Sequence, residues 1–349
     1  MCRSAIALLF ALAAGGRVSA QSSARAPGGT LNGVVRDSTT GRPVGYALVL
    51  VVGGEQRVFA SESGRFTLTG LGAGGLTLRI QQIGFRAVTL TLKLDTTPEA
   101  SGAPGLEVRL SRRPVVLPEI VVDGDVCSGT EALAAEASGE TVIDEALKNA
   151  ERLLVLEKSY PFKVVFRQTT AQLDTGRQQV SQRTDTLRYD TRGLLGYRRG
   201  RVLEGRRGER EVANYFTTSD LAREEFQKWH CFWYSGSDTT NEGRPAHRID
   251  FAPLAKTRSP DWAGSLLIDP ATMMLVRSEA RLVNLRSRET TFTSAQCVVL
   301  YREIIPTLVI ESTAECTTSR SARIPHSELR WELILFGFVG KSPVATGPP

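Results

Sequence analysis

Apolar and polar residues begin to alternate at Leu31 and continue to do so, in short runs, until about Leu110. A period of two places one face of each run in a core and the other in water, as in half-buried β-strands. Turn signals such as TTGRP, GGEQ and GAGG separate the runs. The pattern predicts a small seven-stranded β-sandwich over residues 30–112, with strands in LNGVVRD, GYALVLVV, RVFAS, GRFTLTGL, GLTLRIQQIG, FRAVTLTLKL and LEVRLS.

A stretch rich in Pro, Gly, Ala and acidic residues follows at 113–138, and we expect it to be a linker. Beyond it, the segment from Gly139 to Pro161 changes to helical periodicity, with acidic residues in its first turn. Proline cannot continue a helix, so Pro161 should end it. The predicted helix carries a single apolar stripe made of Ile143, Ala146, Leu147, Ala150, Leu153 and Leu154.

A series of strand-like runs then continues almost to the end of the chain. Strands joined by short turns favour an antiparallel meander, which can curl around the helix. We therefore predict a mainly β protein with a second domain, an antiparallel half-barrel covered by one helix, over 139–340, and a flexible tail over 341–349. The predicted strands are FKVVFRQTT, QQVSQRTDTLRYD, GLLGYRRGRVLE, AHRIDFAP, AGSLLIDP, MLVRSEARLVN, TTFTSAQCVVLYRE, TLVIESTAECTTS and ELRWELILFGFV.

The first twenty residues predict a secretory signal peptide, because Arg3 precedes the apolar run AIALLFALAAGG and small residues precede Gln21. No later segment has the roughly 20 apolar residues of a membrane-spanning helix. Cleavage would remove Arg3 and Arg17 and lower the net charge from +6 to about +4. So small a charge does not indicate a nucleic-acid partner. We expect an exported protein in the periplasm or at the outer membrane, or an extracellular one.

Four cysteines remain after cleavage: Cys127, Cys231, Cys297 and Cys316. An even number in an oxidising compartment favours two disulfides, for which three pairings are possible. Cys297 and Cys316 would lie opposite each other if a hairpin turns near Pro306 and Thr307. Cys231 is assigned to Cys127, a bridge that would clamp the linker to the sheet, and the crossed pairings stay open.

Two groups of side chains are candidates for binding. Trp229, Trp233 and Trp262, with Trp331, would line a ligand groove if they are not core residues. Arg198, Arg199 and Arg201 belong to an arginine-rich stretch that also contains Arg192, Arg206, Arg207 and Arg210, and they would bind phosphate-bearing lipid or an acidic partner unless the stretch is a solvated loop.

We predict no catalytic residue, no cofactor-binding residue and no metal ligand. His230, His247 and His326 are far apart in sequence, and a zinc-binding HxxE pair is missing from the chain. Spacing does not support a Ser-His-Asp set, a glycosidase acid pair, a phosphate loop or a dinucleotide fingerprint. The expectation is a non-enzymatic protein without a cofactor; a hydrolase with a site assembled from unrecognised parts is the alternative.

The N-terminal pattern G-x-V-x-D-x-x-T-G-x-P-V-x-x-A-x-V, followed by S-x-x-G-x-F-x-L-x-x-L and IGF, resembles the carboxypeptidase regulatory-like domain. This resemblance implies a transthyretin-like sandwich of the carbohydrate-binding-like type, an accessory module of many exported proteins. The residues that match are Gly33, Val35, Asp37, Thr40, Gly41, Pro43, Val44, Ala47, Val49, Gly64, Phe66, Leu68, Leu71, Gly84 and Phe85.

The C-terminal half, with GRPAHRIDFAP and WAGSLLIDPATMMLVRSEARL, is similar to LolA-like half-barrels of the bacterial envelope. The match involves Gly243, Pro245, Ile249, Phe251, Pro253, Gly264, Leu266, Ile268, Asp269, Thr272, Leu275, Arg277 and Glu279. Asp269 is expected to make a turn, and Arg277 and Glu279 to face solvent. RRPVVLPEIVVDGD resembles the segment before the plug of TonB-dependent receptors, but the remaining chain is too short for their barrel.

These observations favour a binding or adaptor protein of the envelope, with a glycan, a lipid or an outer-membrane protein as its partner. A LolA-like lipid or lipoprotein carrier, whose helix moves aside to admit acyl chains, is the first alternative. It predicts a continuous apolar cavity. An accessory module of a TonB-dependent or peptidase system is the second.

Overall fold

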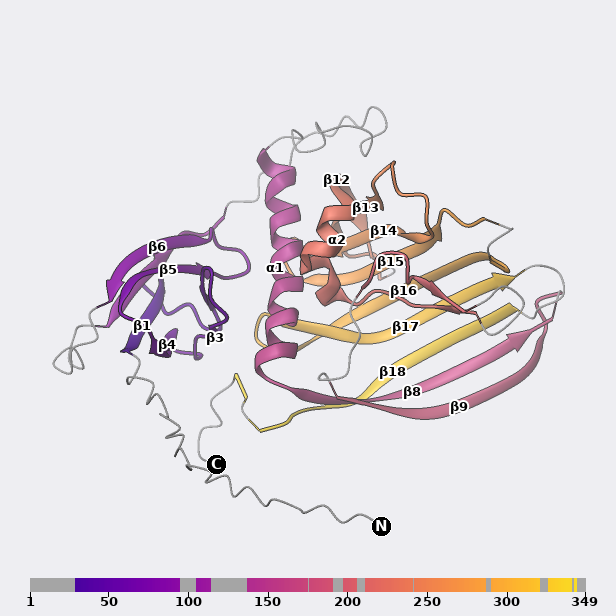
Figure 1. The fold of residues 1–349 in the computed structure, drawn as a ribbon, viewed down its shortest axis with the longest axis horizontal. Coiled ribbons are helices and arrows are strands. Elements are labelled where there is room, and N and C mark those ends of the chain that lie inside the picture. Colours follow the sequence, from indigo (N-terminus) through magenta and orange to yellow (C-terminus); the bar gives the residue numbers. More distant parts are fainter. Residues whose placement is uncertain are drawn as a thin grey trace, which may run out of the picture.

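The computed structural model describes residues 29–94, 105–113, 137–174, 176–190, 197–205, 211–240, 242–286, 290–320, 326–340 and 342–343. One long helix stands between a small sandwich and a large curved sheet (Figure 1). Strands predominate, so the predicted mainly β fold class is confirmed. The predicted signal peptide, most of the linker over 113–138, Cys127 and most of the tail over 341–349 lie outside the described residues.

The N-terminal sandwich has the seven strands that the alternating pattern predicts. Its three-stranded sheet has the order β4-β1-β7, and its four-stranded sheet has the order β3-β2-β5-β6. Val35, Leu78 and Leu110 are completely buried between the two sheets. The strands are β1 (Gly29–Asp37), β2 (Leu48–Val51), β3 (Arg57–Phe59), β4 (Arg65–Leu71), β5 (Gly74–Gln81), β6 (Val88–Leu94) and β7 (Leu106–Leu110).

The motif residues of this sandwich hold its turns. Gly64 has a φ of +73°, and its carbonyl accepts a 2.8 Å hydrogen bond from the backbone N–H of Val35. A Cβ at position 64 would lie 2.5 Å from the Val35 carbonyl oxygen, so only glycine fits. The Asp37 carboxylate accepts hydrogen bonds from the backbone of Thr39 and from Arg112, both at 2.8 Å. The Arg112 bond is the main reason why the pKa of Asp37 is lowered to about 2.

The C-terminal domain is one nine-stranded antiparallel sheet with the order β12-β13-β14-β15-β16-β17-β18-β8-β9. Neighbours in the sheet are neighbours in the chain except where β18 pairs with β8. β9 and β12 are its two edges, so the sheet curls without closing (Figure 1). Its strands are β8 (Phe162–Leu173), β9 (Gln179–Asp190), β12 (His230–Thr239), β13 (Pro245–Pro253), β14 (Asp261–Ile268), β15 (Leu275–Val283), β16 (Phe292–Ile305), β17 (Leu308–Arg320) and β18 (His326–Phe338).

One predicted strand is wrong, and two observed strands, β11 and β12, were not predicted. The described part of GLLGYRRGRVLE is irregular except for β10 (Leu203–Glu204), which pairs only with β11 (Val212–Ala213). The ninth strand of the large sheet is instead β12, which pairs with β13 over nearly its whole length. The residues between β9 and β12 also form η3 (Thr218–Ala222) and the short helix α2 (Glu224–Trp229). Described apolar residues of this stretch, such as Phe216, Leu221 and Phe226, are buried in one core cluster with residues of the sheet without being part of it.

The predicted helix is α1 (Ala137–Ser159), and Pro161 follows it. Its single apolar stripe is wrong as a description of burial, because Leu147 and Leu154 are only half-buried. Four polar side chains are buried instead, and at most 4 % of any of these residues is exposed: Glu145, Lys148, Asn149 and Arg152. Because the sheet covers one side of α1 and the sandwich covers another, the helix is buried on two sides although it was expected to have one apolar face.

Buried polar contacts attach α1 to the sandwich. Glu145 accepts a 2.9 Å hydrogen bond from the backbone N–H of Gly84, and Lys148 donates to the carbonyl of Phe85 at 2.8 Å. Near the end of α1, the hydroxyl of Tyr160 accepts a hydrogen bond from the backbone of Phe59. Apolar residues of β2 and β3 join this contact in one cluster with the end of α1.

A second set of contacts attaches α1 to the sheet. The side-chain amide of Asn149 donates to the carbonyl of Met273 at 3.0 Å and accepts from the backbone N–H of Leu275 at 3.2 Å. Arg152 donates to the carbonyl of Thr307 at 3.0 Å, in the turn between β16 and β17. The helix is therefore held by hydrogen bonds to both domains at once.

Candidate functional site

A cavity of about 490 Å³ lies on the concave side of the half-barrel. Inward-facing residues of β8, β16, β17 and β18 form its floor, and α1 contributes Leu153 and Glu157 at one end. Its roof contains part of residues 211–222, which include β11 and η3 and which we call the cover segment. Its volume falls within the roughly 300–1,000 Å³ of small-molecule sites.

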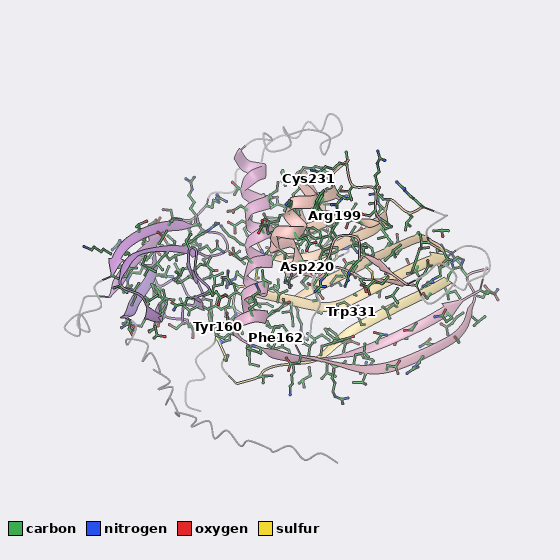
Figure 2. All side chains as sticks on the ribbon, viewed as in Figure 1. Tyr160, Phe162, Arg199, Asp220, Cys231 and Trp331 are labelled. Carbon is green, nitrogen blue, oxygen red and sulfur yellow. A yellow bond between two sulfur atoms is a disulfide. The ribbon has the colours of Figure 1, made fainter. Side chains whose placement is uncertain are left out.

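The middle of the cavity is apolar and aromatic. Phe166 meets Trp331 edge-on, with their ring centroids 4.9 Å apart, and Trp331 lies over the curved sheet in Figure 2. Phe162, Phe216 and Phe292 add further rings to the lining. Such a surface favours contact with hydrocarbon over contact with water.

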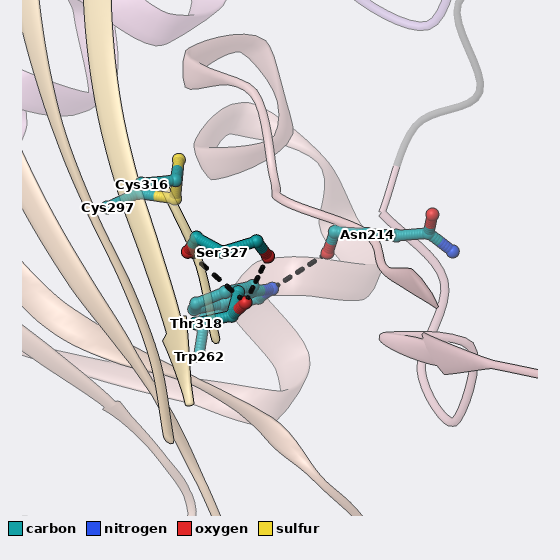
Figure 3. Close-up of a disulfide and its surroundings, with 6 residues drawn as sticks. All are labelled: Asn214, Trp262, Cys297, Cys316, Thr318 and Ser327. Atoms are coloured by element: carbon teal, nitrogen blue, oxygen red, sulfur yellow. Dashed lines mark hydrogen bonds between the residues drawn. A yellow bond between two sulfur atoms is a disulfide. The ribbon is translucent and has the colours of Figure 1, made fainter. Parts of the chain in front are cut away.

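The disulfide between Cys297 and Cys316 also lines the cavity. Figure 3 draws it together with Trp262, another residue of the lining. It joins directly opposed residues of β16 and β17, and the turn between these strands contains Thr307, as the hairpin prediction requires. Cys231 is disulfide-bonded as well, and its expected partner, Cys127, lies outside the described residues.

Two carboxyl groups close the end of the cavity at α1. Glu311 of β17 accepts a 3.2 Å hydrogen bond from the backbone N–H of Thr218 in the cover segment. The hydroxyl of Thr218 in turn donates to Tyr301 at 2.7 Å. Glu157 of α1 has only 10 % of its side chain exposed, is hydrogen-bonded by Ser219 and lies 4.0 Å from the guanidinium of Arg223. Burial is the largest influence on both acids and raises the pKa of each to about 7.

The opposite end of the cavity is polar but balanced in charge. Arg320 donates to the carbonyl of Glu211 at 2.9 Å and stacks over the ring of Phe292. The Glu211 carboxylate also accepts a 3.0 Å hydrogen bond from the backbone of Thr291. Hydroxyl groups of Thr318 and Ser327, 2.7 Å apart, lie beside this end (Figure 3).

The two ends are far apart along one strand. Glu311 and Arg320 both belong to β17 and are nine positions apart, or roughly 30 Å at the rise of an extended strand. The lining thus has carboxyl groups at one end, hydrocarbon in the middle and a guanidinium with hydroxyl groups at the other. An elongated amphiphile matches this order of surfaces better than a compact polar molecule does.

The structure separates the binding residues predicted from the sequence. Trp262 is buried in the cavity wall, where its indole N–H donates to the carbonyl of Asn214 at 2.9 Å (Figure 3). Trp229 lies on α2, with the guanidinium of Arg199 3.4 Å from the centre of its ring. That face of the indole is therefore not open to a sugar. Trp233 is half-buried on β12 and does not line the cavity.

The arginines do not form a described phosphate site. Arg198 and Arg201 are exposed, and Arg199 lies beside α2 (Figure 2). The backbone N–H of Arg199 donates to Glu225 at 3.1 Å. The remaining predicted arginines, at positions 192, 206, 207 and 210, lie outside the described residues.

One buried polar cluster has the residue types of a catalytic site. Tyr197 donates to Asp261 at 2.7 Å, and the Nε2 of His230 is 3.4 Å from the same carboxylate. The side chains of His230 and Asp261 are fully buried, and Phe226 stacks on the imidazole with 3.8 Å between the ring centroids. This packing leaves no room for a substrate, so the cluster anchors α2 and β12. Among the described residues, no group of His, Cys, Asp and Glu side chains is arranged to hold a metal ion.

Three residues of the cavity were not predicted as site residues: Glu157, Glu311 and Arg320. Ser312 forms a bulge in β17, so Glu311 lies opposite Tyr301 while Thr313 lies opposite Leu300. The bulge reverses the alternation and places Glu311 on the same face as the disulfide. Glu157 continues the helical spacing of the predicted stripe one turn beyond Leu153, but it is acidic and was not counted with the apolar residues. An acidic residue directly after the apolar run TLVI was the only sequence signal at Glu311.

The turn prediction for Asp269 agrees with the structure, because its carboxylate accepts hydrogen bonds from the backbone of Ala271 at 2.9 Å and Thr272 at 2.8 Å. Arg277 and Glu279, two positions apart on β15, form an ion pair. Only 14 % of the Arg277 side chain is exposed, so this residue does not face solvent as predicted. In the described part of the chain, no helix is long and apolar enough to cross a membrane.

Comparison with known proteins found no curated protein sequence similar to this chain. Among solved structures, a LolA superfamily protein from Nitrosomonas europaea is 10% identical, with a TM-score of 0.32, over 58% of this chain and 94% of that protein. A DUF1329 family protein from Desulfovibrio piger is 8% identical, with a TM-score of 0.31, over 57% of this chain and 95% of that one. MucB, in a complex with MucA, is 8% identical, with a TM-score of 0.19, over 55% and 94% of the two chains.

For the N-terminal sandwich, residues 30–110 match the carboxypeptidase regulatory-like domain. The matched range includes Asp37 and Gly64, whose turns are described above. The resemblance to the regulatory-like domain expected for the N-terminal sandwich is thus confirmed, and the solved structures similar to the rest of the chain include a LolA superfamily protein.

Proposed function

We propose that this chain is a non-enzymatic envelope binding protein that holds the apolar chain of an amphiphile, such as a lipid acyl chain, in the cavity of its half-barrel. The observation that carries the proposal is the cavity of about 490 Å³, with its aromatic middle and polar ends. Burying hydrocarbon there contributes about 25 cal/mol per Å² of apolar surface removed from water. Binding therefore requires no covalent chemistry.

The shape of the lining supports an elongated ligand. Lining residues extend along β17 from Ile310, next to α1, to Arg320 at the far end. A hydrocarbon chain parallel to the strands would contact Phe166, Trp331 and the disulfide in turn. Its polar group would find hydrogen-bonding partners at the Arg320 end, where Thr318 and Ser327 provide hydroxyl groups.

The N-terminal sandwich is proposed to brace the binding domain. It contacts α1 through buried hydrogen bonds and an apolar cluster, and α1 forms one end of the cavity. A glycan held by the loops of the sandwich, and a protein partner on its surface, are the alternatives.

Native mass spectrometry of protein purified from a bacterial periplasm in mild conditions tests the proposal. We expect bound species whose masses match lipids and which are lost in organic solvent. Displacement of the neutral apolar dye N-phenyl-naphthylamine by a long-chain fatty acid or by phospholipid vesicles then identifies the class of ligand. Displacement by neither, with no co-purified lipid, would contradict the proposal, and retained oligosaccharide would favour the glycan alternative.

A variant that fills the cavity provides the matched test. Leu329 of β18 lines the cavity, whereas its neighbour Glu328 is exposed. Leu329→Trp should lower dye affinity at least about tenfold, because the indole takes the place of the ligand. Glu328→Trp adds the same side chain to the same strand and should leave affinity unchanged. Equal effects of the two substitutions would show that the dye binds outside the cavity.

The proposal of an envelope location rests on the signal-peptide pattern of residues 1–20. Expression of the full-length chain in a Gram-negative host, followed by fractionation and N-terminal sequencing, tests it. We expect a mature N-terminus at Gln21 in the periplasmic or outer-membrane fraction. Uncleaved protein in the cytoplasm would contradict this part of the proposal.

A further inference from the structure

The floor of the cavity changes from apolar to polar along the strand β8. The β8 residues that line the cavity are, in order from α1, Phe162, Val164, Phe166, Gln168 and Thr170. They are every second residue of the strand, so they share the concave face of the sheet. The first three have hydrocarbon side chains, and the last two carry an amide and a hydroxyl group. The strand therefore has an apolar surface near α1 and a polar surface farther from it.

The neighbouring strands β18 and β17 change in the same direction. The lining passes from Trp331 to Ser327 on β18, and from Cys316 to Thr318 and Arg320 on β17. Ser327 lies opposite Thr318 in the register of these strands, and their hydroxyl groups are 2.7 Å apart (Figure 3). The polar parts of the three strands thus lie together, away from α1. We call this group of side chains the polar end: Gln168, Thr170, Thr318, Arg320 and Ser327.

The guanidinium at the polar end is already balanced by a carboxylate. Arg320 donates to the carbonyl of Glu211 at 2.9 Å, and its Nη1 lies 3.9 Å from the carboxylate of the same residue. The Glu211 side chain is only 4 % exposed and also accepts hydrogen bonds from the backbone and the hydroxyl of Thr291. The other charged residues of the described lining, Glu157 and Glu311, are at the α1 end. A charged headgroup at the polar end would therefore enter without a free partner of opposite charge, which is unfavourable.

The rim of the polar end is balanced in charge as well. On the edge strand β9, Arg183 lies opposite Thr170 and Asp185 lies opposite Gln168, so both face the concave side. These two residues form an ion pair with each other at 2.8 Å. The Arg183 side chain is 80 % exposed, whereas that of Glu157 at the α1 end is 10 % exposed. The polar end is thus the more exposed end of the cavity, where a headgroup can stay in contact with water.

The hydrogen-bonding groups of the polar end can both donate and accept. Among the described residues, the amide of Gln168 and the hydroxyl of Thr170 have no hydrogen-bond partner, so both are available to a ligand. An amide or a hydroxyl group can donate and accept, as can the hydroxyl groups of a sugar or of glycerol. A carboxylate can only accept, and an ammonium group can only donate. A polyhydroxyl headgroup therefore uses more of these groups than either ion does.

The α1 end suits the tip of a hydrocarbon chain. Ile310 lines the cavity there. The two acids at this end are already hydrogen-bonded to the cover segment, Glu311 by Thr218 and Glu157 by Ser219. They differ in this respect from the free amide and hydroxyl of the polar end. The arrangement favours a ligand whose headgroup is at the polar end and whose chain points toward α1.

We propose, resting on the proposed function, that the ligand carries an uncharged headgroup with several hydroxyl groups, a sugar or a glycerol, which binds at the polar end. The headgroup forms hydrogen bonds with Gln168, Thr170 and Thr318. The hydrocarbon chain extends from there toward α1 and contacts Trp331 and Phe166. The protein thus favours a glycolipid or an acylglycerol over a fatty acid or a fatty amine.

Displacement of N-phenyl-naphthylamine by amphiphiles with chains of equal length tests the headgroup. The mature protein is titrated at neutral pH with dodecyl maltoside, monolaurin, laurate or dodecylammonium, each below its critical micelle concentration. We expect the maltoside and monolaurin to displace the dye at concentrations about tenfold lower than the two ions require. The tighter binder of these two then distinguishes a sugar from a glycerol headgroup.

The titrations separate a failure of this inference from a failure of the proposed function. Equal affinities for all the compounds, or tighter binding of laurate or dodecylammonium, would overturn the inference and leave the proposed function in place. If none of the compounds displaces the dye and no lipid co-purifies, the proposed function fails and the inference fails with it.

Substitutions on β8 locate the headgroup. The double variant Gln168→Met/Thr170→Val removes the amide and the hydroxyl but keeps side chains of similar size. Its affinity for dodecyl maltoside and monolaurin should fall about tenfold, while its affinity for laurate and the dye stays as in the wild type. Thr169→Val is the matched control, because Thr169 is on the opposite face of the strand, where it hydrogen-bonds Thr184. Unchanged affinity in the double variant, or an equal loss in the control, would contradict the proposed position.

A variant on β17 covers the case in which the double variant does not fold. Thr318→Val removes the hydroxyl that lies beside Ser327. We expect the affinity for dodecyl maltoside and monolaurin to fall about threefold and that for laurate to stay unchanged. Wild-type affinity for all three ligands in Thr318→Val would show that the headgroup does not reach β17, and would overturn the proposal.

Discussion

Lys148 and Glu145 form an ion pair one turn apart on α1, with 2.7 Å between Nζ and Oε1, although at most 2 % of either side chain is exposed. Each partner also hydrogen-bonds the backbone of the sandwich, at Phe85 and Gly84 respectively. The two charged groups therefore pair with each other and also form hydrogen bonds that join α1 to the sandwich. Burial nevertheless dominates and raises the pKa of Glu145.

Removing one charge of this pair should lower the free energy of unfolding. Lys148→Met leaves Glu145 without its cation and leaves the carbonyl of Phe85 without a donor. We expect the free energy of unfolding to fall by about 3 kcal/mol, which denaturant titration measures. Arg183→Met, which breaks the exposed ion pair with Asp185, is the control and should cost under about 1 kcal/mol. Similar losses in the two variants would show that the joint does not depend on the buried pair.

The pair Glu157 and Glu311 should make stability depend on pH. Each has a folded-state pKa of about 7 against an ordinary value of 4.5, so the folded protein binds more protons than the unfolded chain between these values. The contribution of the protonated Glu157 and Glu311 to folding stability is complete below about pH 4.5 and is lost as the pH rises through 7. Either substitution to Gln should therefore stabilise the protein by about 1–3 kcal/mol at pH 8 and by much less at pH 5.

Denaturant titrations at these two pH values measure the difference. The control is Glu315→Gln, whose side chain is 67% exposed, and it should leave the pH dependence as in the wild type. If Glu157→Gln and Glu311→Gln changed stability equally at both pH values, the two acids would not be protonated in the folded protein.

The disulfide in the cavity floor should stabilise the half-barrel. Cys297 and Cys316 are 19 residues apart, so their bond closes a short loop of the unfolded chain. Replacing both with Ala should cost about 3 kcal/mol on the chain-entropy account, because the unfolded state regains freedom. Thermal unfolding with and without a reductant measures the effect. A reductant should destabilise the wild type more than the double variant, and an equal response would assign the effect to the bond at Cys231.

Gly64 should tolerate no side chain. Its φ of +73° strains any other residue, and a Cβ would lie 2.5 Å from the carbonyl oxygen of Val35. Gly64→Ala should lower the stability of the sandwich by more than about 1 kcal/mol. Gly72→Ala is the matched control, because a Cβ there meets nothing within 4 Å, and its effect should be small. Equal melting temperatures for the two variants would contradict this account of the turn.

The alternating pattern alone predicted the sandwich because its strands satisfy a local rule. Val35, Phe66 and Leu78 point inward at period-two positions, and the turns between the strands have residues suited to turning. The same rule identified eight of the strands in the half-barrel. It failed at residues 197–204, where apolar residues pack onto a sheet without pairing with it.

The cavity could not be predicted in this way, because its residues come together only through long-range packing. Glu157 and Glu311 are 154 positions apart in the chain and meet at η3, which belongs to neither element. The bulge at Ser312 decides on which face Glu311 lies, and a bulge has no signature in the alternation of residue types.

The amino-acid sequence by itself determined the two β frameworks, the position of the long helix and the opposed cysteines of one hairpin, because periodicity and turn chemistry act between near neighbours in the chain. Only the tertiary structure decided that α1 is buried on two sides, that polar residues such as Lys148 become interior, and that Glu157 lies 4.0 Å from the guanidinium of Arg223 at one end of an apolar cavity. Those features depend on which surfaces meet after the strands have formed, and burial then sets the charge state of the groups enclosed.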